Sequence, residues 1–518
     1  MTQAGEPELH EVSAVEHHRK GPLYAPRVRI HPKRVRGAFR RLKWWIMAVT
    51  LAIYYVTPWL RWDRGPHVSD QAVLVDLANR RFFFFFIEIW PHEFYYVAGL
   101  LIMAGIGLFL VTSTVGRAWC GYACPQTVWV DLFLVIERFF EGDRNARVRL
   151  DAAPWSANKL RRRGAKHAVW LLIAVSTGGA WIFYFADAPR LAVDLVRGEA
   201  PGIAYATIAV LTATTYVLGG LLREQVCIYM CPWPRIQGAM LDENSLTVSY
   251  NDWRGEPRGR HLRRNREDDG PRGDCVDCNA CVAVCPMGID IRDGQQFECI
   301  TCALCIDACN GVMERIGRPG GLISYATLSD YNANMALARG PDGEIDPGRT
   351  RAPDGGLADG VRRFSWRIVL RPRTLGYAGV WCAIGIVMLG LLATRDRLEL
   401  HVVHDRNPLF VRLSDGSIRN GYTIKVLNMQ TEPREVTLTI EGLPGARLRL
   451  AGATGEPSPS LTFSAAPDAL KTAKVYVHLS RADLPGSHSG FHFLAEARDD
   501  GEVAAREAVF ESPRRDSG

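Results

Sequence analysis

The chain has 518 residues, enough for several domains, and 47% of them are hydrophobic. Its mean hydropathy of −0.05 is that of an average soluble protein, but the apolar residues are clustered into long segments, so the average is misleading. The formal net charge is +7, and the basic residues gather beside the apolar segments. This pattern indicates membrane topology and argues against nucleic-acid binding.

Five apolar segments are predicted to cross a membrane as helices. Each is uncharged over about 20 residues, the length that a bilayer requires. They cover residues 44–60, 94–115, 168–186, 202–222 and 375–393. A basic tail, residues 1–43, precedes them, and about its first 30 residues are expected to be disordered. The aromatic run at residues 82–90 is too short to cross and is expected at the membrane interface.

The distribution of Lys and Arg predicts the orientation of these segments. The tail and the loop 117–166 carry ten each, whereas the loops 61–93 and 187–201 carry four and two. Because basic residues are enriched on the cytoplasmic side, the tail, the loop 117–166 and the segment 223–373 are expected in the cytoplasm. Five crossings then place residues 396–518 in the periplasm.

The C-terminal region, residues 396–518, is predicted to be an all-β domain. Apolar and polar residues alternate in runs such as 422–428 and 435–442, and Gly, Pro and Asp separate the runs. About seven such strands indicate an immunoglobulin-like sandwich. No cysteine follows Cys382, so the sandwich is expected to lack a disulfide.

Two matching cysteine runs lie in the cytoplasmic segment, in a domain predicted at about residues 265–320. Residues 275–286 read CVDCNACVAVCP and residues 299–310 read CITCALCIDACN, so C-x₂-C-x₂-C-x₃-C occurs twice. This is the bacterial ferredoxin pattern, in which the fourth cysteine of each run ligates the other cluster. The predicted ligands of one 4Fe–4S cluster are Cys275, Cys278, Cys281 and Cys309. The predicted ligands of the second are Cys299, Cys302, Cys305 and Cys285.

Zinc sites and disulfides are the alternatives for these eight cysteines. A zinc site uses two C-x₂-C pairs and leaves the third close cysteine without a role. Disulfides require an oxidising compartment, which the predicted orientation does not provide. Two iron–sulfur clusters therefore explain the spacing best.

Four further cysteines form a second repeated motif. CGYACP at 120–125 follows the second predicted span and CIYMCP at 227–232 follows the fourth, so both lie at the same membrane face. If the local chain is helical, cysteines four residues apart share one side. Soft thiolates select Cu(I), zinc or iron–sulfur centres, whereas the alternative is that these small residues only pack. The four candidate ligands are Cys120, Cys124, Cys227 and Cys231.

The predicted spans offer little other metal chemistry. Cys382 stands alone inside the fifth span and is interpreted as a packing residue. The spans contain no histidine except His167 at an edge, so a transmembrane haem with two histidine ligands is not expected. Electrons then have no evident route across the bilayer within this chain.

Several stretches outside the ferredoxin runs are similar to a known family. They include GRAWCGYACPQTVWVDLF at 116–133 and DRNPLFVRLSDGSIRNGYTIKVLN at 405–428. With the double ferredoxin run, the sequence resembles the cytochrome c oxidase accessory protein family CcoG, also called FixG or RdxA, from about Arg36 to the C-terminal domain. One departure is Asn310, where a bacterial ferredoxin run usually has proline.

The resemblance implies a polyferredoxin of the bacterial inner membrane with two 4Fe–4S clusters. It implies reduction of Cu(II) to Cu(I) for assembly of a cbb-type haem–copper oxidase, with Cys120, Cys124, Cys227 and Cys231 as the copper-linked thiols. Oxidase assembly factors and copper carriers would be its partners, and a homodimer is compatible with the sequence. Two other functions stay open. They are a general respiratory subunit that passes quinol or ferredoxin-type electrons, and a redox-sensing structural assembly factor.

Overall fold

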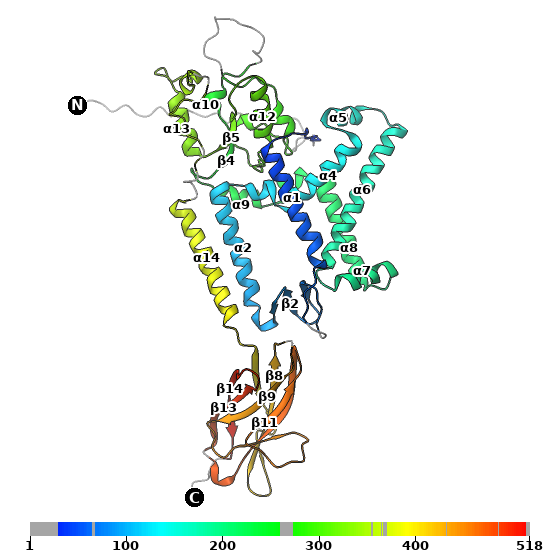
Figure 1. Ribbon diagram of the computed structural model, residues 1–518, viewed down its shortest axis with the longest axis vertical. Helices are drawn as coiled ribbons and strands as arrows, with labels where there is room; N and C mark the ends of the chain where they lie inside the picture. Colours follow the sequence, from blue (N-terminus) through cyan, green and yellow to red (C-terminus); the bar gives the residue numbers. More distant parts are fainter. Residues whose placement is uncertain are drawn as a thin grey trace, which may run out of the picture.

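The computed structural model describes residues 29–513 apart from 65–67, 260–272, 354–355, 364, 366–369, 431 and 485. The described residues form three tiers along the longest axis (Figure 1). Short helices and loops form one end, long helices form the middle, and a β-sandwich forms the other end. The predicted disorder of the tail falls largely on residues 1–28, outside the described residues.

Within the part of the chain that the structure describes, three helical segments of the middle tier are long and apolar enough to cross a membrane. They are Pro91–Val115, which contains α2 (Tyr95–Val115); Gly202–Leu222, which contains α8 (Gly202–Thr214) and a π-helical continuation; and Pro372–Ala393, which is α14. These segments correspond to the second, fourth and fifth predicted spans. α2 and α14 pack against each other.

The first and third predicted spans are also helices, with different bounds. α1 covers Ala38–Val56 and α6 covers Ala157–Ile182, and each begins with basic residues before its apolar part. The basic turn of α1 is packed inside the protein: Arg40 is 7% exposed and donates to both carboxylate oxygens of Asp131 at 2.9 Å. The predicted tail therefore ends in a docked helix, because Asp131 offers a buried partner that local sequence does not reveal.

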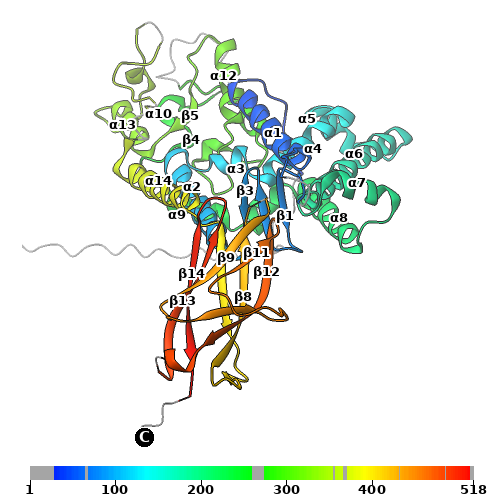
Figure 2. The ribbon, with the colours of Figure 1, turned by 60° about the horizontal axis from the view of Figure 1, so that its bottom comes forward.

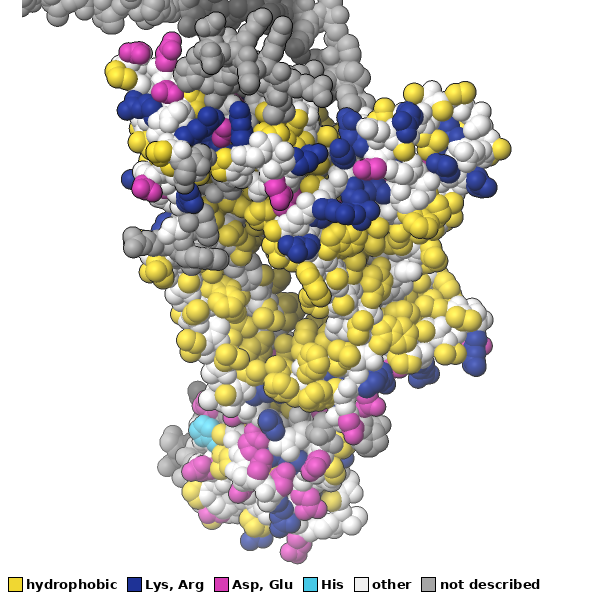
Figure 3. All heavy atoms as spheres, turned by 45° about the horizontal axis from the view of Figure 1, so that its top comes forward, with side chains coloured by type: hydrophobic (Ala, Val, Ile, Leu, Met, Phe, Trp, Pro, Cys, Tyr) yellow, Lys and Arg dark blue, Asp and Glu magenta, His cyan; other side chains and the backbone are white. Residues whose placement is uncertain are grey.

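The middle tier exposes a belt of apolar side chains, which Figure 3 shows on one face. Lys and Arg gather along its border next to the short-helix domain. Large exposed hydrophobic residues occur on all the long helices, as at Ile53, Leu101, Leu172, Ile203 and Ile386. A continuous apolar belt of this kind marks association with a membrane.

The aromatic run and the strand before it form a small antiparallel sheet at the end of the middle tier that faces the sandwich (Figure 1). Its strands are β1 (Val73–Asp76), β2 (Arg81–Phe84) and β3 (Ile87–Ile89). The guanidinium of Arg81 lies 3.9 Å from the centre of the Trp90 ring. The sequence placed these aromatic residues at an interface but did not predict strands.

Short helices connect the long ones. On the side of the short-helix domain they are α3 (Ala118–Tyr122), α4 (Pro125–Glu141), α5 (Arg144–Ala152) and α9 (Trp233–Met240), and on the opposite side lies α7 (Ala188–Arg197). An ionic cluster joins several of them. Glu137 of α4 pairs with Arg147 of α5, with Arg223 at 2.8 Å and with Lys166 of α6 at 3.6 Å.

The domain of short helices and loops holds the ferredoxin runs. Its elements are β4 (Thr247–Tyr250), α10 (Asp252–Gly255), α11 (Ala280–Val284), α12 (Leu304–Arg315), β5 (Ile323–Ala326) and α13 (Leu328–Ala338), and β4 pairs antiparallel with β5. Asp307 of α12 fixes this domain to α1. Its carboxylate accepts hydrogen bonds from the backbone N–H groups of Phe39 at 3.3 Å and Arg40 at 2.7 Å, so it caps the N-terminus of α1 from a distant part of the chain.

The C-terminal domain consists of two antiparallel sheets, with strand orders β10-β12-β8-β6 and β11-β9-β13-β14, and β7 pairs with β8. The strands are β6 (Leu398–His404), β7 (Val411–Arg412), β8 (Ile418–Asn428), β9 (Arg434–Glu441), β10 (Arg447–Leu450), β11 (Leu461–Ala465), β12 (Ala469–Leu479), β13 (His488–Ala497) and β14 (Val503–Glu511). Tyr422, Ile424 and Val426 are fully buried between the sheets, whereas the alternate residues Thr423 and Lys425 are not. Figure 2 shows the two layers of the predicted sandwich. Among the described residues of this domain there are nine strands, against the seven or so predicted.

Candidate metal centre

The two ferredoxin runs share one backbone conformation. In each run the residues on both sides of the second cysteine are left-handed: Asp277 and Asn279 in the first, and Thr301 and Ala303 in the second. None of these residues is glycine, so the surrounding structure holds them in this region. Each loop then leads directly into a helix, α11 or α12. The repeat in sequence is therefore also a repeat in geometry.

The structure brings the first predicted ligand set together. Cys309 comes from the second run, and its neighbours are Cys281, Cys275 and Cys278 of the first run. Burial and then these three thiols raise the pKa of Cys309 to about 12. Four cysteine thiols are the donors that a 4Fe–4S cluster uses, so this set fits the group.

The second predicted set is also assembled. The pKa of Cys285 is raised to about 12. Burial is the largest cause, and the nearby thiols of Cys302 and Cys299 also raise it. The pKa of Cys305 is raised well above its usual value by burial and then by Cys302, Cys299 and Cys285. A cavity of about 20 Å³ lies among these four thiols and the adjoining Cys281. The donor set again fits a 4Fe–4S cluster.

The departure at Asn310 has a structural explanation. In the first run, Pro286 follows Cys285 and helix α11 has already ended at Val284. In the second run, α12 continues to Arg315, and a proline inside a helix would remove a hydrogen bond and clash. Asn310 also accepts a hydrogen bond from the backbone N–H of Gly321 at 2.8 Å. Asn310 therefore allows α12 to continue past Cys309, and all the predicted ligands are kept.

A buried ion pair supports the start of the first run. The side chain of Arg254 is fully buried and pairs with Asp274, the residue before Cys275. Arg254 also donates to the carbonyl of Gly320 at 2.8 Å, which links the first run to the segment after α12. Asp274 is contacted further by Arg351. Through these two contacts, Arg254 holds the start of the first ferredoxin run in place.

The second cysteine motif lies where α3, α4 and the segment after α8 meet. Cys120 belongs to α3, Cys124 precedes α4, and Cys227 lies in the π-helical turn Val226–Met230, which Cys231 follows. No continuous α-helix runs through either pair, so the hypothesis of two thiols on one helix face is wrong. The reason is that Pro125 and Pro232 favour a new element after each pair.

The fold nevertheless makes the four thiols neighbours. The pKa of Cys227 is raised to about 12. Burial is the largest cause, and the nearby thiols of Cys124, Cys120 and Cys231 raise it as well. We call Cys120, Cys124, Cys227 and Cys231 the four-cysteine centre. Burial likewise raises the pKa of Cys120 to about 11, and its Sγ donates a hydrogen bond to Oε1 of Gln237 at 3.0 Å.

Among the described residues, no three His, Cys, Asp or Glu side chains are placed to hold a single metal ion. A 4Fe–4S cubane binds each thiolate at a different iron atom, so the ferredoxin sets need not satisfy a single-ion geometry. The four-cysteine centre is a neighbourhood of thiols and not a closed coordination shell.

The four-cysteine centre adjoins the second ferredoxin run. An ideal Cβ on Gly121 would lie 2.6 Å from the carbonyl oxygen of Ile300 and 3.0 Å from the N and Cα atoms of Cys302. Cys120 and Cys302 are buried in the same apolar core, against which Cys227 packs. The two thiol-rich regions are therefore in direct contact through protein backbone.

Sequence reasoning missed three residues at this junction. Gly121 permits the close approach, Gln237 binds the Cys120 thiol, and Arg117 places its charge near Cys120, Cys227 and Cys299. The only sequence signal was that Arg117 and Gly121 belong to the stretch 116–133 that carries the family resemblance. Gln237 had no signal, because it contacts Cys120 only through the fold.

Three family models match parts of the chain. The model described as "4Fe-4S dicluster domain" matches residues 222–328, "4Fe-4S binding domain" matches 97–141, and "IG-like fold at C-terminal of FixG" matches 388–513. The first match contains all eight ferredoxin cysteines. The second contains Cys120 and Cys124.

Nitrogen fixation protein FixG of Rhizobium meliloti (strain 1021) is 64% identical over 95% of this chain and 94% of its own length. The chain belongs to the FixG family. Protein RdxB of Cereibacter sphaeroides is 54% identical over 88% of this chain and 90% of its own, and protein RdxA is 52% identical over 95% and 99%. The resemblance seen in the sequence is thereby confirmed. This FixG-family chain is an iron–sulfur protein of electron transfer, associated with a membrane through its apolar helices.

Proposed function

We propose that this FixG-family chain reduces Cu(II) to Cu(I) at the four-cysteine centre and so assists assembly of a cbb-type haem–copper oxidase. The observation that carries the proposal is the backbone contact of Gly121 with Ile300 and Cys302. It leaves little protein between the thiols that would hold copper and the thiols that would hold the second cluster. Short separation favours electron transfer between the two.

Copper is the substrate in this proposal, and the chain prepares its site. The clusters, when bound by the eight ferredoxin cysteines, supply one-electron storage and transfer. Soft thiolates favour Cu(I), so copper held by the four-cysteine centre is biased toward accepting an electron. The positive charge of Arg117 opposes the effect of burial on Cys120 and Cys227 and so favours their thiolate forms. Gln237 orients the thiol of Cys120.

We propose five membrane crossings, by α1, α2, α6, α8 with its continuation, and α14. The contacts at the ferredoxin domain support this number. Phe39 at the start of α1, Arg117 just after α2 and Cys227 after α8 all contact that domain. If α2 and α8 each cross toward the ferredoxin domain, the chain has to cross away from that domain before each of them. We assign these two outward crossings to α1 and α6.

The orientation in the bacterial inner membrane follows from charge. The loop 117–166 carries ten basic residues and the loop 187–201 carries two. Basic residues favour the cytoplasmic side, so the ferredoxin domain is proposed to be cytoplasmic and the sandwich periplasmic. The sandwich would then be available to oxidase assembly factors and copper carriers.

A second candidate function is general electron transfer with a third iron–sulfur group at the four-cysteine centre. The match of residues 97–141 to a 4Fe–4S binding domain, which includes Cys120 and Cys124, favours it. A third candidate is a redox-sensing assembly factor, for which the clusters would not need to pass electrons onward. Iron content and copper reduction distinguish the three.

The test uses full-length protein purified without oxygen, reduced, and mixed with Cu(II) in the presence of a Cu(I)-specific chelator. Wild type is expected to contain about eight irons per chain, from two clusters of four, and to form Cu(I). Replacing all four cysteines of the centre by Ser should keep this iron and lose most copper binding and reduction. Cys382→Ser, which changes a lone cysteine of α14, is the matched control and should behave as wild type.

Two results would reject copper reduction at this site. Wild-type iron near twelve per chain, with loss of about four in the quadruple variant, would assign a third cluster to the four-cysteine centre. Full copper reduction by the quadruple variant would place the copper site elsewhere and leave only a packing role for these cysteines.

A further inference from the structure

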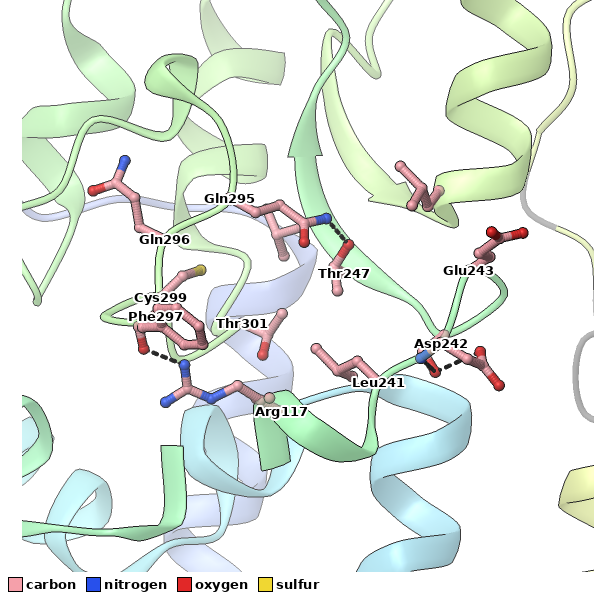
Figure 4. A pocket seen from close by; sticks show the side chains of 14 residues that line it. Arg117, Leu241, Asp242, Glu243, Thr247, Gln295, Gln296, Phe297, Cys299 and Thr301 are labelled. Carbon is pink, nitrogen blue, oxygen red and sulfur yellow. Dashed lines mark hydrogen bonds between the residues drawn. The ribbon is translucent and has the colours of Figure 1, made fainter. Parts of the chain in front are cut away.

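A cavity of about 490 Å³ lies beside the second ferredoxin run (Figure 4). Its lining comes from the loop after α9, from β4, and from the segment leading into Cys299. In Figure 4, Phe297 and Cys299 lie above Arg117, and the Gln295 amide points toward the hydroxyl of Thr247. The cavity thus combines an apolar wall, hydrogen-bonding groups and a predicted cluster ligand.

This cavity is not the space that a cluster would fill. The space among the second-run thiols is the separate cavity of about 20 Å³, which Cys285, Cys299, Cys302 and Cys305 all line. The larger cavity touches only Cys299 among the described cysteines. A molecule bound there would contact a cluster ligand from outside, which suits an electron donor.

The cavity lies at the level where two membrane helices end. Arg117 comes two residues after Val115, the last residue of α2. Asp242, also in the lining, pairs at 2.8 Å with both Arg371 and Arg373 at the start of α14. A molecule dissolved in the bilayer can therefore bring its headgroup to the cavity while its apolar tail stays in the membrane.

The lining carries little net charge. Among the described residues that line the cavity, Arg117 is the one cation, and Asp242 and Glu243 are acidic, but Asp242 is paired with Arg371 and Arg373. A neutral redox molecule suits such a lining, and the volume is in the range of small-ligand sites.

The lining also offers hydrogen-bonding groups beside its apolar wall. They include the Gln295 amide and the hydroxyl of Thr247, to which that amide donates. A quinol has a neutral apolar ring with a hydroxyl at each end, so it can hydrogen-bond to these groups while its ring packs on Phe297, Leu241 and Leu328.

We propose that this cavity binds the headgroup of a membrane quinol, which makes quinol the electron donor of the protein. Only the later fate of the electrons rests on the proposed copper reduction. A quinol oxidised here becomes the quinone and releases two electrons and two protons. The two iron–sulfur clusters that the eight ferredoxin cysteines would hold would accept these electrons one at a time. The protons pass to water at the exposed carboxylate of Glu243. No covalent bond to the protein forms.

Photoaffinity labelling with an azido-quinone tests the site in full-length protein held in lipid nanodiscs without copper. Label is expected on peptides that contain residues 241–248 and 295–301, and decylubiquinol should displace it. Leu328→Trp should weaken labelling at least tenfold, because the larger ring projects into the space where the quinone ring would pack. Leu409→Trp is the matched control in the sandwich, since Leu328 and Leu409 are 45% and 47% exposed, and it should label as wild type.

Thr247→Val is a second variant, which keeps the β-branched shape of the strand residue and removes one hydroxyl. Its quinone affinity should fall about fivefold, as expected for one neutral hydrogen bond. A second readout is loss of visible cluster absorbance when decylubiquinol is added anaerobically. If Leu328→Trp loses its iron, Thr247→Val and the position of the label decide the outcome.

Label elsewhere in the chain, or equal labelling of Leu328→Trp and Leu409→Trp, would overturn the proposal. Absence of cluster reduction by decylubiquinol would overturn the donor role even if the quinone binds. Because these measurements contain no copper, a failure of copper reduction leaves them unaffected. Copper reduction by chemically reduced protein is equally independent of the quinol site.

Discussion

The backbone of Gly121 lies against the backbone of Cys302, so close that an ideal Cβ at position 121 would be 3.0 Å from the N and Cα atoms of Cys302. The carbonyl oxygen of Ile300 would be closer still, at 2.6 Å. Backbone atoms cannot turn aside as a flexible side chain can. The contact between the four-cysteine centre and the second ferredoxin run therefore requires glycine.

Gly121→Ala is expected to separate these two regions. Overpacking of this kind costs about 1–3 kcal/mol, and relief of the clash would move Cys120 away from Cys302. We expect Cu(I) formation by the reduced protein to slow at least tenfold while iron content stays near that of wild type. Stopped-flow mixing with Cu(II) measures the rate. Gly164→Ala is the helical control, because no atom lies within 4 Å of a Cβ there. An undiminished rate in Gly121→Ala would show that electrons do not cross this contact.

Arg254→Met is expected to weaken the support of the first ferredoxin run. It leaves the carboxylate of Asp274, 2% exposed, without its most buried partner, although Arg351 and Arg318 still contact it. Loss of one member of a buried pair costs about 3–5 kcal/mol, and these two remaining arginines place the expected loss near the lower end. Thermal unfolding and iron content measure the effect, and iron should fall toward half because Asp274 directly precedes Cys275.

The matched control for this variant is Arg258→Met. Arg258 and its partner Glu256 are 37% and 34% exposed in their side chains, at a separation of 3.8 Å. An ion pair of this kind contributes less than about 1 kcal/mol, so iron should be retained. Equal losses of iron in the two variants would contradict a specific role for Arg254.

Glu137 is expected to make the junction of α4, α5 and α6 sensitive to acid. Burial alone would raise the pKa of Glu137, but Arg223 and Arg147 outweigh it and lower that pKa from 4.5 to about 2. Because the folded-state pKa lies below the unfolded value, Glu137 stabilises the protein above about pH 4.5, and this contribution is lost as the pH falls toward 2. Its size is on the order of 3 kcal/mol.

Comparison of wild type with Glu137→Gln by thermal unfolding at several pH values measures this contribution. The variant should be less stable at neutral pH, and the difference should shrink below about pH 4.5. Acid lability of the clusters affects both proteins alike, so the difference between them isolates Glu137. A difference that stays constant from neutral to acidic pH would mean that the Glu137 charge is not what stabilises the junction.

Reporter fusions are expected to give the pattern of five crossings. A periplasmic reporter should be active after Gly198 and after Asp405, and a cytoplasmic reporter should be active after Ala153. The physical reason is that basic loops stay on the cytoplasmic side. The loop 117–166 is rich in Lys and Arg, whereas the loop 187–201 is poor in them. A periplasmic signal after Ala153 would remove α1 from the crossings, and a cytoplasmic signal after Gly198 would remove α6.

The sequence by itself determined the features that depend on local spacing. Apolar length identified α2, α8 and α14, because a bilayer requires an uncharged stretch of sufficient length. Alternation of apolar and polar residues identified β8, because successive strand residues face opposite sides. The spacing of the ferredoxin runs predicted two crossed ligand sets, and the same spacing recurs as a pair of left-handed loops around Cys278 and Cys302.

Only the tertiary structure decided which distant groups meet. The four-cysteine centre forms between α3, α4 and the turn after α8, although neither of its pairs lies on one helix. Asp307 fixes the start of α1, and Arg117 lies between that centre and the 490 Å³ cavity. These contacts join residues far apart in the chain, so they leave no period or spacing in the sequence. They arise when buried charges, thiols and backbone polar groups find partners as the elements pack together.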